Sequence, residues 1–171
     1  MNYLSNSTLN YPKSGIRVMF DLAAKYPDAI NLSVGEPNFE TPEHIKAAAI
    51  KAINGGLTKY NPNAGIYELR EAIAEKYGND LGYKLEAENV MVAVGGMEAI
   101  FLALSTILNN GDEVIIPDPA YPNYCGTVSI LGGKIVRVPL YEKHGFKLQP
   151  EDLEKAITPK TKVLIINYPT N

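Results

Sequence analysis

The sequence predicts an α/β fold in which helices cover both faces of a mainly parallel sheet. From residue 90 onward, short apolar stretches alternate with helix-like segments, an order typical of βαβ units. These apolar stretches lack the strict alternation of a half-exposed sheet, so helices should cover both faces. The chain has 171 residues, 46% of them hydrophobic, which suffices for one domain with a sizeable core.

The chain before residue 90 is predicted to be mainly helical. Residues 1–13 are polar and are expected to form an arm, followed by a helix over about 15–26 and a short strand at 30–32. A later helix is expected in GIYELREAIAEKYG, residues 65–78, because apolar side chains recur there on one helical face.

The clearest helix signals lie in the segment FETPEHIKAAAIKAINGG. Thr41 is expected to cap this helix and Pro42 to take its first position, while Gly55 and Gly56 end it. Its expected apolar face consists of Ile45, Ala48, Ala49, Ala52 and Ile53.

The second half of the chain supplies the sheet. The expected elements are a strand at 90–95, a helix at 97–111, a strand at 113–117, a helix at 123–133, a strand at 134–140, a helix at 150–157 and a strand at 162–167. In an open α/β sheet, ligands bind beyond the carboxyl ends of the strands. The loops that follow these strands are therefore the first candidates for a functional site.

Composition excludes several classes of protein. The net charge is −3, from 16 basic and 19 acidic residues, and no Lys/Arg run indicates binding to nucleic acid or to an anionic membrane. No apolar run approaches the roughly 20 residues that span a bilayer, and the first residues lack a signal-peptide pattern. The single cysteine, Cys125, excludes an intrachain disulfide. We therefore expect a cytoplasmic protein.

Gly95 and Gly96 stand between a predicted strand and a predicted helix. The first amides of a helix have no internal partners and carry partial positive charge, so this turn is a candidate cradle for a phosphate or carboxylate. The alternative is a tight turn that binds nothing, since the segment matches neither a Walker A loop nor G-x-G-x-x-G. A cradle requires the charge of Glu98 to turn away or to be paired.

Three further loops carry candidate residues, each with a plainer alternative. Tyr121, in IIPDPAYPNY, could stack on a flat ligand or simply pack within a proline-rich loop. Gly35, in NLSVGEPNFETP, could meet a substrate carboxylate or only form a turn. Tyr60, in KYNPNAG, could donate its hydroxyl hydrogen to an anion or have no ligand.

Other reactive residues are expected to be structural. His44 and His144 have no companions at metal-ligand spacing, so no metal site is predicted. Cys125 has no evident base beside it and is expected to be a small buried residue.

In order and spacing, these stretches resemble the class I/II aminotransferases, the pyridoxal-phosphate (PLP) enzymes of fold type I. The resemblance is to the aspartate and aromatic aminotransferase branch, and it runs from about residue 14 to residue 171. The segments that carry it are NLSVGEPNFETPEHI, KYNPNAGIYELREAIA, VAVGGMEAIFLAL, IIPDPAYPNY and IINYPTN. Five segments in family order are far more specific than any one alone.

The resemblance implies roles for individual residues. The main-chain N–H groups of Gly96 and Met97 would hold the PLP phosphate, although Met97 lacks the hydroxyl that many relatives have there. Tyr121 would stack on the pyridine ring, and Asn171 would donate a hydrogen bond to the phenolic oxygen of PLP. Tyr60 would reach across a dimer interface to the phosphate of a second copy.

The resemblance also implies a substrate contact and a domain organisation. Gly35 would lie against the substrate carboxylate. Residues 1–40 would form the N-terminal arm and a small-domain segment. Residues 41–171 would form the first, incomplete part of the large domain, a truncated three-layer α/β/α structure with a mainly parallel sheet.

The function that the resemblance implies is that of an N-terminal fragment of a homodimeric, PLP-dependent aminotransferase. Such enzymes transfer an amino group between an amino acid and a 2-oxo acid. The family's Schiff-base lysine would lie beyond residue 171, and none of the thirteen lysines present stands in a matching context. We therefore assign no catalytic residue and expect the isolated chain to be inactive.

Other interpretations remain open. The parent protein could be a PLP carbon–sulfur lyase or decarboxylase of the same fold. The chain could also be a short, non-catalytic module that binds PLP or serves as an interaction subunit. A nucleotide-binding Rossmann-like domain is disfavoured, because its glycine fingerprint is missing.

Overall fold

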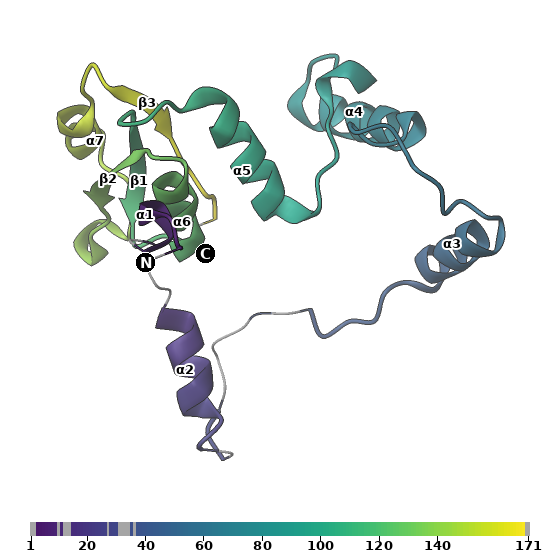
Figure 1. The fold of residues 1–171 in the computed structure, drawn as a ribbon, viewed down its shortest axis with the longest axis horizontal. Helices are drawn as coiled ribbons and strands as arrows, with labels where there is room; N and C mark the ends of the chain where they lie inside the picture. The colour runs from purple at the N-terminus through teal and green to yellow at the C-terminus, as the bar shows by residue number, and fades with distance from the viewer. Residues whose placement is uncertain are drawn as a thin grey trace. The chain divides into compact units, whose positions relative to one another are not determined.

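The computed structural model describes residues 3–9, 11, 15–26, 28–30, 35 and 37–169. The chain divides into two compact units, which we call the sheet unit (residues 1–29 and 100–171) and the helical unit (residues 30–99). Figure 1 shows the elements in chain order, from α1 to β3.

The sheet unit is built on three parallel strands in the order β2-β1-β3. The central strand is β1 (Glu113–Asp118), flanked by β2 (Lys134–Pro139) and β3 (Thr161–Leu164). The pairing of β1 with β2 is regular throughout, whereas its pairing with β3 has a bulge between Glu113 and Val114. Because the strands are parallel, their carboxyl ends lie at one edge of the sheet.

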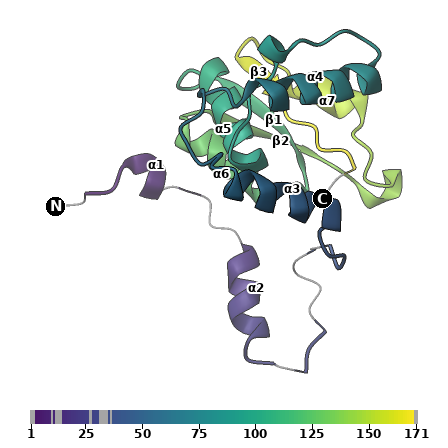
Figure 2. The same cartoon turned by 90° about the vertical axis from the view of Figure 1, so that its right-hand side faces the viewer.

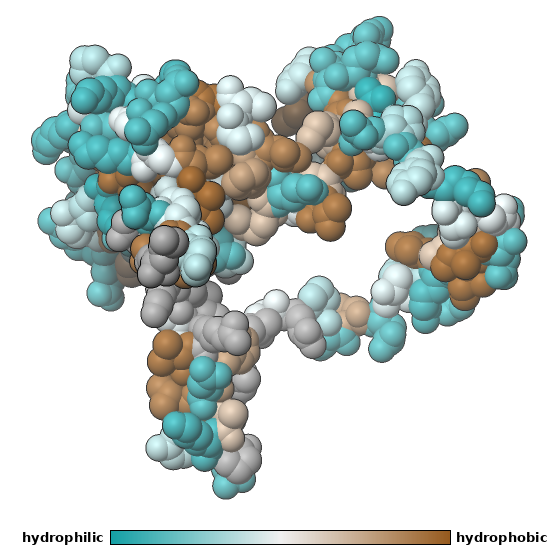
Figure 3. All heavy atoms as spheres, in the orientation of Figure 1, coloured by the Kyte–Doolittle hydropathy of each residue, from teal (hydrophilic) through white to brown (hydrophobic). Residues whose placement is uncertain are grey.

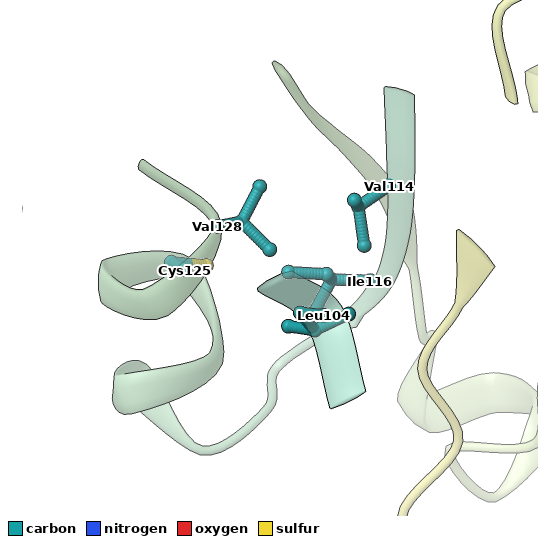
Figure 4. Packing of buried hydrophobic residues seen from close by; sticks show 5 residues of the cluster. All are labelled: Leu104, Val114, Ile116, Cys125 and Val128. Atoms are coloured by element: carbon teal, nitrogen blue, oxygen red, sulfur yellow. The ribbon is translucent and has the colours of Figure 1, made fainter. Parts of the chain in front are cut away.

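Helices cover both faces of this sheet. The C-terminal part of α5 (Gly95–Ile107) and α6 (Pro122–Ile130) lie on one face, and α7 (Pro150–Ala156) lies on the other (Figure 2). Between the first face and its helices is a buried cluster, drawn in Figure 4, of Leu104, Val114, Ile116, Cys125 and Val128. The parallel sheet between two helical layers confirms the predicted α/β class, and Cys125 is buried as expected.

The remaining elements of the sheet unit are short. They are α1 (Asn6–Leu9), α2 (Gly15–Ala23) and η2, a 3-10 turn over Glu142–His144. The ring of Tyr11 lies so close to Gly126 of α6 that a Cβ at this glycine would overlap it. The contact joins the start of the chain to α6. Among the residues that the structure describes, no helix is long and apolar enough to cross a membrane.

The helical unit contains α3 (Glu43–Asn54), α4 (Tyr67–Leu81), the 3-10 turn η1 (Ala87–Asn89) and the start of α5. α4 packs on η1, and Ala74 and Ala87 are buried. By contrast, α3 buries none of its residues. The apolar face predicted for α3 exists, but its isoleucines are exposed, and brown apolar atoms gather there in Figure 3.

The end of α3 follows the prediction, and its start does not. Gly56 has a left-handed φ of 76°, its N–H donates to Ile53, and the next N–H donates to Ala52, a Schellman arrangement. At the start, Pro42 is the N-cap and the helix begins at Glu43, without a side-chain cap. The prediction of Thr41 as the cap was wrong, because the chain turns into the helix one residue later.

The predicted strand at 90–95 does not form. Among the described residues no strand pairs with this segment; instead, the Val92 N–H donates to the Ala64 carbonyl at 3.0 Å. An apolar run becomes a strand only where a neighbouring strand accepts its hydrogen bonds. The following helix begins at Gly95 rather than at residue 97.

Several predicted elements end earlier than expected, among them α6, which ends at Ile130 rather than residue 133. α5 stops at Ile107 rather than residue 111, because the Asp112 carboxylate accepts a hydrogen bond from the Asn109 N–H at 2.8 Å. β3 ends at Leu164 rather than at residue 167: the Ile165 N–H still donates to Ile115, but the next donor from β1 would be Pro117, which has no N–H.

Near the start of the chain, the predicted helix forms but is shorter than expected, whereas the strand expected at 30–32 is not seen in the part of it that the structure describes. The first long helix, α2, ends at Ala23 and is followed by a turn, shorter than the expected 15–26. Of the strand expected at 30–32, Ile30 is not in a strand, and the other two residues lie outside the described residues.

Candidate functional site

The turn into α5 has the geometry of an anion cradle. Gly95 has a left-handed φ of 80°, and its N–H donates to Ala93 at 2.9 Å. The helix begins at once, so the amides of Gly96 and Met97 lie in its first turn. Within the described part of the chain, nothing accepts a hydrogen bond from these two amides. Apart from its own helix and chain neighbours, a Cβ built on Gly96 would meet no atom of the described residues within 4 Å, so space beside it is open to a bound group.

Glu98 is paired, as a cradle requires. Its carboxylate accepts a hydrogen bond from the Val94 N–H, the residue just before the turn. This contact resembles a capping box, in which an acidic side chain in the first turn reaches back to the preceding backbone. The negative charge of Glu98 is thereby held by the backbone outside the helix and leaves the amides of Gly96 and Met97 available.

The segment before the turn is attached to α4. Arg70 donates from Nε to the Val90 carbonyl at 3.0 Å and from Nη2 to the Ala87 carbonyl at 2.6 Å. Val92 is attached through its N–H to Ala64. The cradle therefore extends from a stretch that side-chain and backbone hydrogen bonds hold in place.

Tyr60 and Gly35 are both exposed in the helical unit. The side chain of Tyr60 is fully exposed, on the loop between α3 and α4. Among the described residues, a Cβ built on Gly35 would meet nothing within 4 Å, so this side of its backbone can be approached. Each position is accessible to a ligand or to another chain.

Tyr121 lies in the sheet unit, where its ring is fixed by two neighbours. It is the N-cap of α6, and Pro122 follows it as the first helical residue. Its hydroxyl accepts a hydrogen bond from the Asn123 side-chain amide at 2.7 Å. Its ring meets that of Tyr124 edge to face, with centroids 5.5 Å apart and an interplanar angle of 80°. A half-buried ring held in this way suits stacking on a flat ligand.

A cavity of about 460 Å³ opens at the carboxyl edge of the sheet. Its apolar lining includes Pro119, Tyr124, Leu140, Phe146, Ile165 and Tyr168. Lys147 and Asn167 add polar groups. This is the edge at which the sequence predicts a site, and the loop after β3 forms part of the wall. Sequence reasoning missed Phe146 and Lys147, because no local signal shows that the loop after β2 folds back over this edge.

The predicted residues fall into separate parts of the molecule. Gly35, Tyr60, Gly96 and Met97 belong to the helical unit, and Tyr121 belongs to the sheet unit. Asn171 lies outside the described residues. Each unit on its own presents candidates: helix-terminal amides in one, and in the other an oriented Tyr121 ring whose neighbour Tyr124 lines the cavity.

A second cavity, of about 750 Å³, lies in the helical unit between α4 and η1. Its wall is acidic, with Glu71, Glu75, Glu86 and Glu88. The negative charge of Glu71 raises the pKa of the Tyr67 phenol, which also lines this cavity. No candidate residue from the sequence lines it. Across the described residues, no three His, Cys, Asp or Glu side chains are grouped to hold a metal ion.

Comparison with known proteins identifies a family and several relatives. Residues 27–171 match the family model for aminotransferase class I and II. An aspartate aminotransferase of Pyrococcus horikoshii is 43% identical over 169 residues, covering 99% of this chain and 43% of the relative. An aromatic-amino-acid aminotransferase 2 of Thermococcus litoralis is 47% identical over 159 residues, covering 92% of this chain and 41% of the relative.

Solved structures agree with the sequence comparison. The aspartate aminotransferase of Thermus thermophilus with maleate matches with a TM-score of 0.93 at 40% identity, over 100% of this chain and 46% of that one. The chain thus spans less than half the length of each of these proteins.

Proposed function

Because the chain belongs to the class I and II aminotransferases, we propose that it is the N-terminal part of an enzyme that transfers an amino group between an amino acid and a 2-oxo acid. The observation that carries this proposal is the match of residues 27–171 to the family model. Enzymes of this family depend on pyridoxal phosphate. When bound, PLP supplies the electron-withdrawing ring that stabilises negative charge on the substrate.

The first turn of α5 fits the phosphate group of PLP. The amides of Gly96 and Met97 would each donate a hydrogen bond to it, aided by the positive end of the helix dipole. The open space beside Gly96 leaves room for the group, and Glu98 is already paired with the Val94 N–H. Since Met97 has no hydroxyl, the backbone would provide this part of the phosphate site.

Tyr121 would orient the ring of PLP. The hydrogen bond from Asn123 and the edge contact with Tyr124 hold the Tyr121 ring in place. Stacking would add about 0.5–1.5 kcal/mol beyond the effect of buried area. Asn171 would donate a hydrogen bond to the phenolic oxygen of PLP, a role that rests on the family match alone.

The remaining roles involve the substrate and a second copy of the chain. In a homodimer, the exposed hydroxyl of Tyr60 would reach the phosphate bound by the other copy. Gly35 would present its accessible backbone to the substrate carboxylate. In this arrangement, residues 1–40 would be the arm and a small-domain segment, and residues 41–171 the first part of the large domain.

We propose further that this chain by itself does not catalyse transamination. None of its thirteen lysines stands in the sequence context of the lysine that holds PLP covalently in the family. An assay of the purified chain with PLP, 2-oxoglutarate and either aspartate or an aromatic amino acid should show no turnover. Turnover that scales with chain concentration would contradict this part of the proposal.

The test of the phosphate site is a comparison of two substitutions at one position. Gly96→Pro removes one N–H donor while keeping a residue that helices accept in their first turn. Gly96→Ala keeps the donor and adds a Cβ in open space. We expect saturable binding of PLP by the unchanged chain and by Gly96→Ala. We expect binding roughly 10- to 100-fold weaker for Gly96→Pro, the range for a hydrogen bond to a charged group.

Pyridoxal, which lacks the phosphate, is the control ligand. Its binding should be the same in all three chains, because its contacts do not involve the Gly96 amide. Equal PLP binding by the Gly96→Pro and Gly96→Ala chains would show that the turn does not hold the phosphate. Absorbance of the bound cofactor measures both ligands.

A further inference from the structure

The guanidinium of Arg70 bonds to main-chain carbonyls. It lies half-buried on α4, donating to Val90 at 3.0 Å and to Ala87 at 2.6 Å. Ala87 begins η1 and Val90 directly follows it, so the two bonds attach both ends of this turn to Arg70. A planar guanidinium can make two such bonds at once in fixed geometry, whereas a lysine ammonium lacks the fork.

A second attachment lies two residues beyond Val90. The Val92 N–H donates to the Ala64 carbonyl at 3.0 Å. The neighbouring Gly65 has a left-handed φ of 97°, and a Cβ there would lie only 2.7 Å from the Val92 side chain. The Cδ of Arg70 lies 3.9 Å from the same Cβ position. Only glycine lets these chain segments approach so closely.

The two attachments connect the two features of the helical unit that we propose to contact phosphate. Ala64 belongs to the loop that carries Tyr60, and Val92 stands three residues before Gly95, where the turn that carries Gly96 and Met97 begins. Arg70 holds the stretch between η1 and that turn, and α4 begins directly after the Tyr60 loop. The loop and the turn are thus bonded to each other and to one helix.

We propose that Arg70 is a positioning residue for the phosphate site: it holds the turn at Gly95–Met97 and the Tyr60 loop in one fixed arrangement. The inference rests on the proposed PLP function. It assigns Arg70 no contact with the cofactor. If the enzyme is a homodimer, the same arrangement serves two sites, because the turn binds this chain's phosphate and Tyr60 reaches that of the other copy.

The experiment compares Arg70→Met, Arg70→Lys and the control Lys76→Met in the 171-residue chain. Lys76 lies on the same helix; its exposed side chain pairs with Asp80 at 3.5 Å and lies over the Tyr77 ring, 6.0 Å from the ring centroid. Amide hydrogen exchange at Val92 reports on the attachment, and exchange at Ile115 of β1 serves as an internal reference. We expect exchange at Val92 about 10-fold faster or more in Arg70→Met, as expected for lost bonds from a charged donor. Arg70→Lys should have a smaller effect and Lys76→Met none.

Binding separates positioning from general structural support. In Arg70→Met, PLP binding should weaken about 10-fold while pyridoxal binding stays unchanged, and Arg70→Lys should recover part of the loss. Unchanged exchange at Val92, or equal losses for PLP and pyridoxal, would overturn the inference. If Arg70→Met does not fold, Arg70→Lys decides by the same two measurements.

The exchange measurement also separates this inference from the proposed function. If the unchanged chain binds no PLP, the phosphate proposal fails on its own. Exchange at Val92 still tests the Arg70 attachment in that case. Faster exchange in Arg70→Met supports the attachment, and unchanged exchange overturns it.

Discussion

The central strand β1 and the helix α3 show opposite outcomes for their apolar side chains. Val114, Ile115 and Ile116 of β1 are 0% exposed, because helices and neighbouring strands enclose them. Ile50 and Ile53 of α3 are 57% and 64% exposed. An apolar pattern therefore predicts which face of an element can be buried. Whether that face is buried depends on partners that other parts of the structure must provide.

The largest effect is expected in β1. Ile116→Ala should lower the free energy of unfolding of the sheet unit by about 2–5 kcal/mol, because it leaves a cavity in the buried cluster. Ile116→Val, which removes a single methylene group, should cost about 0.5–1.5 kcal/mol. Urea unfolding followed by circular dichroism measures both. Equal losses for the two variants would mean that the core relaxes around the change.

The next effect concerns tight packing within the helical unit. Gly65→Ala should destabilise this unit by about 2–4 kcal/mol, because it combines a left-handed φ with a clash against Val92. Gly56→Ala, with a φ of 76° and open space, should cost only about 1–2 kcal/mol. The stability loss caused by Gly65→Ala is measured by hydrogen exchange of the α4 amides. The loss caused by Gly56→Ala is measured by exchange of the α3 amides. A Gly65→Ala chain as stable as Gly56→Ala would show that the contact with Val92 is loose.

The sequence alone predicts the α/β class of the sheet unit. It does not show which apolar segments pair as strands. VIIP at 114–117 and VMVAV at 90–94 have the same apolar character, yet only the first is paired. The distinction depends on long-range pairing, which no local pattern encodes. The loop sequence makes Tyr121 a candidate, whereas Phe146 and Lys147 reach the cavity through a fold-back of the chain that no local pattern predicts. The Arg70 attachment joins α4 to a segment 17–20 residues away, beyond any helical period.

Acid should weaken the sheet unit through Glu113. This side chain is 6% exposed, accepts a hydrogen bond from Thr158 at 2.6 Å and pairs with Lys134 at 2.9 Å. The Thr158 hydroxyl first, and then Lys134, hold the pKa of the Glu113 carboxyl below its usual value. The stabilisation is therefore present above about pH 4.3, the pKa of an unfolded glutamate, and is lost as the pH falls through the lower folded pKa.

The test follows urea midpoints from pH 6 down to about pH 3, the range in which carboxylates protonate. The unchanged chain should lose more stability over this range than Glu113→Gln, which cannot titrate. Glu154→Gln, at an exposed position on α7, should behave like the unchanged chain. If Glu113→Gln loses as much stability on acidification as the unchanged chain, the ion pair and hydrogen bond contribute nothing to the pH dependence.

The smallest effect is expected on α3. Ile50→Ala should change the free energy of unfolding by less than about 0.5 kcal/mol, because the side chain is already 57% exposed. Urea unfolding followed by circular dichroism measures it in parallel with Ile116→Ala. A loss above about 1 kcal/mol would mean that the face of α3 is buried in solution, and the contrast with β1 would disappear.

The most direct test of the central claim is to titrate the chain with PLP, treat it with borohydride and locate any modified lysine by mass spectrometry. The claim is that this chain binds the cofactor through the Gly96–Met97 turn and Tyr121 without attaching it covalently. It predicts saturable binding that leaves every lysine unmodified at stoichiometric PLP. A single lysine modified in proportion to binding would contradict the claim. Lys147, which lines the cavity at the carboxyl edge of the sheet, is the first residue to examine in that event.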